Sequence, residues 1–200
     1  MNTPQDELKK ILAAINARNV EEFSARVDLK ELMNVGYDEA TDILAKNCAK
    51  FHELYPKDLF FKFGSTILRL YNEKFRGVHL GLINKVIAAY FDGTFKDAKT
   101  FSETPIKFLA AELNHLLKAL RADFGEENFF GDKATLAVKM VGDNSSYGKM
   151  VGVLNFVLEF NRHGEEWRLN KIKNVEELVP PILDIAERYW PSAWDLGIKI

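Results

Sequence analysis

The segment VLNFVLEFNRHGEEWRLNKIKN, residues 153–174, constrains the fold more than any other part of the chain. Apolar residues occupy every second position of its first half, namely Leu154, Phe156, Leu158 and Phe160. A period of two is that of a β-strand with one buried face. Gly164 lies where the chain must turn, and Trp167 begins the return strand. The segment therefore predicts an antiparallel hairpin, with His163, Glu165 and Glu166 at its turn and Trp167 in the core or in a pocket wall.

The N-terminal part of the chain carries helix signals. Thr3, Asn19 and Asp28 are placed as N-caps before three successive apolar-periodic stretches. We expect the third helix to end near Gly36 and a longer helix to run from Asp38 to about Leu54, before Pro56.

The chain from Leu59 to Tyr90 is rich in aromatic and aliphatic side chains. Helical spacing recurs over residues 60–71, 82–90 and 106–120, with three glycines (Gly64, Gly77 and Gly81) as expected breaks. The basic residues in this stretch (Lys62, Arg69, Lys74 and Arg76) are interpreted as one solvated helix face.

The period changes from helical to two at KATLAVKMVGD, which begins at Lys133. We expect DNSSYG to be a turn, so that three strands form an antiparallel meander. A short helix at VEELVP and a last helix begun by Pro181 follow, and the aromatic tail that ends at Ile200 is expected to cover the protein's own core.

This order predicts an α+β fold in which the helical N-terminal two thirds pack on a curved antiparallel sheet, with a closing C-terminal helix. We expect one domain over residues 1–200. The alternative is a helical domain up to about Gly125 followed by a small β unit.

Composition bounds the function. The net charge of −2 gives no basic face for nucleic acid, and no apolar run approaches the ~18 residues of a membrane span. The single cysteine, Cys48, excludes an intramolecular disulfide and is expected to be a packed hydrophobe. We expect a cytoplasmic protein, with secretion as the alternative if a signal peptide has been removed.

The phrase ARNVEEFSARVDLKEL and the closing hairpin, with Trp167-Arg168 followed by Ile172 and Asn174, resemble the nuclear transport factor 2-like proteins of the cystatin-like superfamily. The similarity covers about the first thirty and the last seventy residues, and it is closest to bacterial proteins of unknown function. It implies a curved sheet wrapped around helices to form an apolar pocket. Relatives such as ketosteroid isomerases and scytalone dehydratases place a carboxylate or a histidine in that pocket. The segment from about Asp38 to Phe124 is longer than the usual fold supplies, and we expect it to fill or roof the pocket.

Catalytic motifs are sparse. The four histidines (His52, His79, His115 and His163) show no metal-ligand spacing, so neither a metal nor a cofactor is expected. Cys48 and His52 lie one helical turn apart, which is more typical of two residues on one helix face than of a nucleophile and its base. Asp28 is a candidate general base if a pocket opens beside it, although a helix cap explains it equally well.

Two functions follow from these observations. The first is a non-catalytic binding or interaction protein that shelters a small apolar ligand or receives a partner chain, a homodimer included. Phe156, Phe160, Trp167 and Tyr71 are its candidate pocket-wall residues. The alternative is an isomerase-like or dehydratase-like enzyme that uses one pocket carboxylate, with Asp28 as the candidate, or one histidine.

Overall fold

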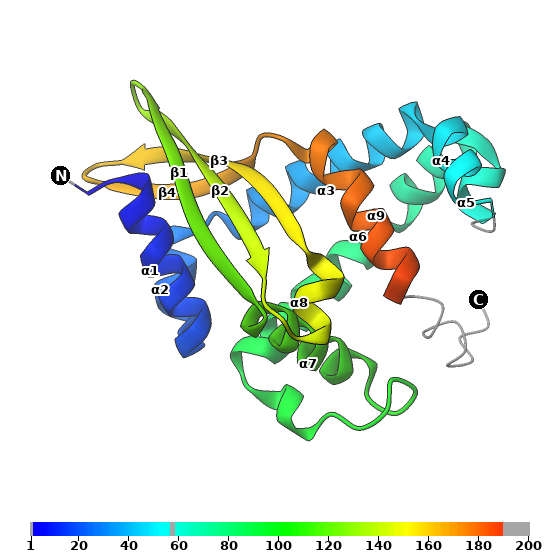
Figure 1. Ribbon diagram of the computed structural model, residues 1–200, viewed down its shortest axis with the longest axis horizontal. Helices are drawn as coiled ribbons and strands as arrows, with labels where there is room; N and C mark the ends of the chain where they lie inside the picture. The colour runs from blue at the N-terminus through cyan, green and yellow to red at the C-terminus, as the bar shows by residue number, and fades with distance from the viewer. Residues whose placement is uncertain (1, 57–58, 190–200) are drawn as a thin grey trace.

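A four-stranded antiparallel sheet forms one end of the molecule, and helices extend from it to the other end (Figure 1). The computed structural model describes residues 2–56 and 59–189. The strands follow one another in the order β1-β2-β3-β4, as a meander of Leu120–Phe130, Lys133–Gly142, Val153–His163 and Glu166–Ile172. The α+β class, the antiparallel meander and the C-terminal helix are as predicted.

Strand register follows from the alternation of apolar residues. Leu136 of β2 lies opposite Leu158 of β3, and Phe160 of β3 lies opposite Leu169 of β4. These side chains therefore share one face of the sheet. A register shift between Phe124 and Glu127 interrupts the pairing of β1 with β2, and such irregularities increase the local bend and twist of a sheet.

Two helices cover the apolar face of the sheet. They are α1 (Pro4–Ala17) and α2 (Val20–Arg26), and each begins at its predicted cap. Thr3 accepts a hydrogen bond from the amide of Asp6, and the Asp6 carboxylate accepts one from the amide of Thr3, which completes a capping box. The core between helices and sheet contains Leu8, Ile11, Phe23, Leu136, Leu158, Phe160 and Trp167.

The helical arm, our term for α3, α4, α5, α6 and α9, projects from the edge of the sheet (Figure 1). Its bounds are Leu29–Lys46 for α3, Cys48–Leu54 for α4, Leu59–Lys62 for α5, Gly64–Phe91 for α6 and Val175–Tyr189 for α9. A second core lies at the far end of the arm and contains Ala45, Cys48, Phe51, Tyr55, Phe61, Leu68 and Val179. Cys48 is buried there, as expected.

A third group of helices closes the lower end of the sheet in Figure 1. It consists of a 3-10 turn (Thr94–Asp97), α7 (Pro105–Lys118) and α8 (Ser146–Val151). Tyr90, at the end of α6, stacks on Phe95 and packs near Ala110 of α7. The arm is thus connected through the long helix α6 to the sheet end of the molecule.

The structure corrects several helix boundaries. Helix α3 runs without interruption through Gly36 and Asp38, where we had expected one helix to end and another to begin. Helix α6 likewise continues through Gly77 and Gly81. Glycine lowers helix stability by only about 1 kcal/mol, so packing along a long helix readily overrides it.

The strand count and the turn were also wrong. The sheet has a fourth strand, β1, because the chain becomes extended at Leu120, within the stretch that we had interpreted as helix. DNSSYG contains the first turn of α8, which Ser145 caps by accepting a hydrogen bond from the amide of Gly148.

The C-terminal segment forms one helix, α9, instead of two. It continues across Pro180 and Pro181, where the buried side chains of Leu178 and Val179 secure it to the rest of the protein. The tail from Trp190 to Ile200, with its predicted role as a cover of the core, lies outside the described residues.

Candidate interaction surface

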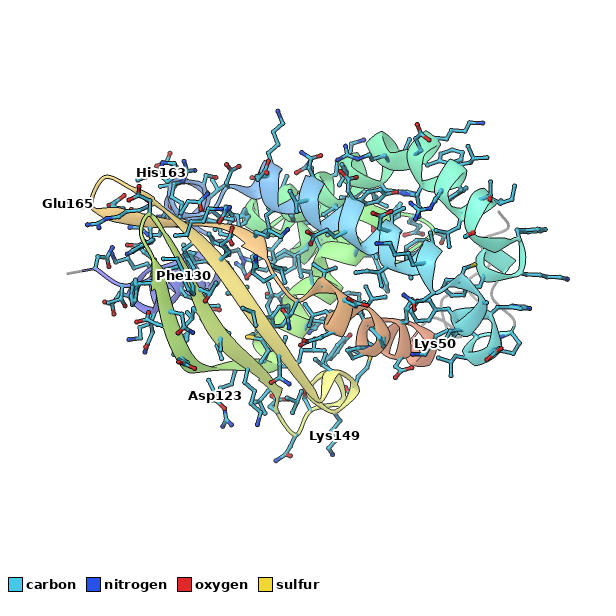
Figure 2. All side chains as sticks on the ribbon, turned by 90° about the horizontal axis from the view of Figure 1, so that it is seen from above. Lys50, Asp123, Phe130, Lys149, His163 and Glu165 are labelled. Atoms are coloured by element: carbon cyan, nitrogen blue, oxygen red, sulfur yellow. The ribbon has the colours of Figure 1, made fainter. Side chains whose placement is uncertain are left out.

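The polar turn HGEE forms the exposed tip of the β3–β4 hairpin, as predicted. His163 ends β3 and Glu166 begins β4, so that the chain reverses at Gly164 with a positive φ of 64°. Figure 2 shows His163 and Glu165 at the tip of the sheet, with Phe130 of β1 nearby. All of these side chains are exposed.

Asp28 caps α3, as its local sequence predicted. Its carboxylate Oδ1 accepts a hydrogen bond from the amide of Glu31 at 3.2 Å, and its own amide donates to the carbonyl of Leu169 at 2.8 Å. These contacts join the start of α3 to the outer edge of β4. The hydrogen bond from Glu31 thus engages one oxygen of the carboxylate that is the candidate general base.

Two hollows are found near the lower end of the sheet. The first, of about 270 Å³, lies between α1, α7, β1 and β2 and is lined by Leu12, Ile15, Asn16, Leu117, Leu120, Ala122, Phe124 and Met140. The second, of about 390 Å³, adjoins it at Leu120, and its mixed lining includes Lys118, Arg121 and Val141. The first hollow, at about 270 Å³, is slightly smaller than typical ligand pockets, which begin at about 300 Å³.

The four predicted pocket-wall residues line neither hollow. Phe160 is fully buried, and Phe156 packs against the same core. Trp167 is buried beside them and its Nε1 donates to the carbonyl of Asn2 at 3.1 Å. Tyr71 lies apart from them on α6. The structure therefore brings three of the four together in the core, and their role in ligand binding stays a prediction.

The histidines are dispersed. His79 of α6 faces Tyr37 of α3, whereas the His115 ring of α7 stacks on Tyr147 of α8 with ring centroids 5.2 Å apart. The Tyr147 hydroxyl donates to the Glu112 carboxylate at 3.0 Å, and burial together with this carboxylate raises the pKa of Tyr147. Among the residues that the structure describes, no group of three or more acidic, histidine or cysteine side chains is arranged to hold a metal ion.

The most unusual feature of the molecule is a line of exposed apolar side chains along α6. It consists of Phe63, which precedes the helix, and of Ile67, Leu70, Val78 and Leu82; we call these five residues the apolar stripe. The spacing of three, four or eight residues between Ile67, Leu70, Val78 and Leu82 places these four on one face of the helix, and Phe63 is exposed at its N-terminal end. Val78 is 65% exposed and Phe63 is 62% exposed, and the least exposed member, Leu82, is still 41% accessible.

The opposite face of α6 is fastened to α3 by polar contacts. Arg76 Nε lies 2.8 Å from the Asp38 carboxylate, and Arg69 pairs with Asp42. The Tyr37 hydroxyl lies 2.7 Å from Nδ1 of His79. In Figure 2, α3 lies between α6 and α9, so that α6 is the outer layer of the arm. A surface helix normally buries its apolar face and exposes its polar one. Here several polar residues of α6 bind α3, while the apolar stripe faces outward.

Two lysines lie within the stripe. Lys74 falls between Leu70 and Val78, and Lys85 follows Leu82 on the same face. Both are exposed, and neither forms an ion pair with the residues that the structure describes. Lys74 lies over the ring of Phe75, whose centroid is 5.5 Å from Nζ.

Two glycines open the centre of the stripe. Gly77 and Gly81 are one helical turn apart, and a Cβ atom built on either would meet no heavy atom within 4 Å. Between Lys74 and Lys85 the backbone of α6 is therefore not covered by side chains at these two positions. Nothing in the described part of the chain packs into this position.

The sequence interpretation missed this surface. Arg69 and Arg76 are partly solvated, as expected, and they also pair with aspartates of α3, whereas Lys74 lies on the face of the stripe. The helical spacing of Phe63, Ile67 and Leu70 was visible in the sequence, but such spacing is usually that of a core. The signal that could have shown otherwise is the mixture of lysines into the apolar face.

Comparisons with models of protein families, with curated proteins and with solved structures found no match. The resemblance to nuclear transport factor 2-like proteins therefore stays a prediction. Within residues 2–56 and 59–189, no helix combines the length and the apolar character that a bilayer crossing requires, α6 included.

Proposed function

We propose that this is a non-catalytic interaction protein that receives a partner chain on the apolar stripe of α6. The observation that supports the proposal is the orientation of α6, with polar pairs toward α3 and five large apolar side chains toward solvent. Several exposed apolar side chains on one helix face are typical of sites that bind another protein, because their exposure to water is costly.

The arrangement of the arm is consistent with this role. Its buried side chains gather mainly at the far end, around Phe51 and Phe61, and α6 buries only Leu68, Ala89 and Tyr90. A helix that contributes so little to its own core is free to present a binding face. When two helices dock, the contacting side chains on each helix recur every three or four residues, as the apolar residues of the stripe do.

Site-specific cross-linking tests the proposal. A photoreactive benzophenone side chain is introduced in place of Val78, and the full-length protein is irradiated in its native cells. We expect a discrete adduct whose second component is identified by mass spectrometry. The adduct should disappear when Ile67→Glu is added, because a charge in the stripe is unfavourable in a desolvated contact.

The matched control places the same photoreactive residue at Val20, which is also exposed on a helix but lies on α2, away from the stripe. We expect no discrete adduct from this position. Equal labelling from Val20 and Val78, or an adduct that persists in the Ile67→Glu variant, would contradict the proposal.

A further inference from the structure

We infer that the partner is a different protein that presents an amphipathic α-helix with acidic residues beside its apolar face. This inference rests on the proposed function and narrows it to one class of occupant. It is derived from the two lysines and the two glycines within the apolar stripe.

Charge selects the partner. Lys74 and Lys85 lie on the same face as the apolar anchors, so any chain that covers the stripe brings them into partly desolvated surroundings. A carboxylate on the partner would compensate each cation, whereas a lysine or arginine there would be repelled. The arginines of α6 do not compete for such carboxylates, because Arg69 and Arg76 already bind aspartates of α3.

Spacing defines the partner further. Lys74 and Lys85 are about three helical turns, or roughly 16 Å, apart along α6. A partner helix that lies along the stripe would therefore carry its two acidic residues about three turns apart, with apolar residues between them. Because Gly77 and Gly81 leave the middle of the stripe open, the backbone of a helix can approach closely there, or one large side chain can be seated.

A second copy of this chain fits less well. Pairing two stripes would bring the lysines of both copies into one interface, and the nearest exposed carboxylate of α6, that of Glu73, lies at the margin of the stripe and not within it. Such uncompensated cations weaken an interface. Charge complementarity thus favours a different chain.

Two synthetic helical peptides test the inference with the full-length protein. Both have the same leucine face; one carries glutamates three turns apart, and the other carries lysines at these positions. Binding is measured by fluorescence anisotropy. We expect the glutamate peptide to bind at least about tenfold more tightly than the lysine peptide, and the preference to diminish with added salt.

Charge reversal of the protein provides the decisive variant. Lys74→Glu combined with Lys85→Glu should invert the preference, so that the lysine peptide binds more tightly. Both lysines are exposed and pair with no acidic side chain within residues 2–56 and 59–189, so the circular dichroism spectrum should be that of the unsubstituted protein. Lys139→Glu, at an exposed position of β2, is the matched control and should leave the preference unchanged.

The outcomes separate this inference from the proposed function. If both peptides bind equally and the charge reversal changes nothing, the stripe binds helices, but the inference that the partner helix carries acidic residues is overturned. The inference is likewise overturned if neither peptide binds and the photoreactive residue at position 78 labels either a second copy or residues 190–200 of its own chain. If neither peptide binds and position 78 forms no adduct at all, both proposals fail.

Discussion

The hydroxyl of Tyr37 on α3 lies 2.7 Å from Nδ1 of His79 on α6, and it also lies 3.2 Å from the carbonyl of Asn72. Arg76, beside the same tyrosine, pairs with Asp38. These contacts form the polar seam of the arm. They determine which face of α6 is turned inward, and the outward face is consequently the apolar stripe.

Removal of the Tyr37 hydroxyl should destabilise the arm. The Tyr37→Phe substitution keeps the ring but leaves His79 and the Asn72 carbonyl without this partner in a partly buried position. We expect a loss of about 1 kcal/mol in the free energy of unfolding, measured by urea denaturation. Combining it with His79→Ala in a double-mutant cycle should give a non-zero coupling energy. Additive effects of the two substitutions would show that the contact contributes nothing.

Alkaline pH should weaken the fold through the same tyrosine. Burial raises the pKa of Tyr37 above its ordinary value of 10.0, although Arg76 opposes the shift. The unfolded chain therefore releases this proton at a lower pH than the folded chain does. The contribution of Tyr37 to stability is consequently constant below about pH 10 and falls as the pH rises through the folded pKa. The free energy of unfolding should fall less between pH 9 and pH 11 for Tyr37→Phe than for the unsubstituted protein.

The fold class was predictable because short-range signals agree with it. Caps at Thr3, Asn19 and Asp28 are local hydrogen bonds, and the alternation around Phe156 and Phe160 specifies one buried face. The boundary at Leu120 was not predictable in the same way. The leucines before it continue a helical period, and the strand β1 forms because it can pair with β2, which is a long-range contact.

The candidate surface could not be predicted because amphipathicity does not say which face is buried. The stripe and the inward face of α6 both contain large apolar residues, such as Val78 and Leu68. The contacts with α3, which include the pairs of Arg76 with Asp38 and of Arg69 with Asp42, decide which face of α6 is turned inward. These two pairs join residues 38 and 27 positions apart in the chain.

Phe160 should be the most sensitive of the four predicted pocket-wall residues. Its side chain is fully buried among core residues, so Phe160→Ala leaves a cavity and should cost about 3–5 kcal/mol of stability. Phe156→Ala should cost less, because Phe156 is only partly buried. Thermal unfolding of both variants provides the measurement. Full stability of Phe160→Ala would contradict its place in the core and would favour a pocket lining.

Asp28 allows a test of capping against catalysis. Asp28→Ala should lower the free energy of unfolding by about 1 kcal/mol, because the amide of Glu31 loses its acceptor. Asp28→Asn should be nearly neutral, since asparagine caps helices as well as aspartate does. Chemical denaturation distinguishes the two variants. If Asp28→Asn were as destabilising as Asp28→Ala, the negative charge and not the cap would be what the fold requires.

Substitution of Gly77 and Gly81, which lie between the apolar residues of the stripe, should have opposite effects on stability and on binding. Gly77→Ala and Gly81→Ala should each stabilise the protein by roughly 0.5–1 kcal/mol, because alanine favours helix and its methyl group meets no atom within 4 Å. Gly142→Ala is the opposite control, since its Cβ would lie 1.9 Å from the carbonyl oxygen of Gly148 and should destabilise the fold by more than about 2 kcal/mol. If a partner helix approaches α6 closely at this point, the same two stabilising substitutions should weaken the binding of the glutamate peptide. Higher thermal stability together with weaker anisotropy binding is therefore the expected pair of results, and unchanged binding would place the partner's backbone elsewhere along the stripe.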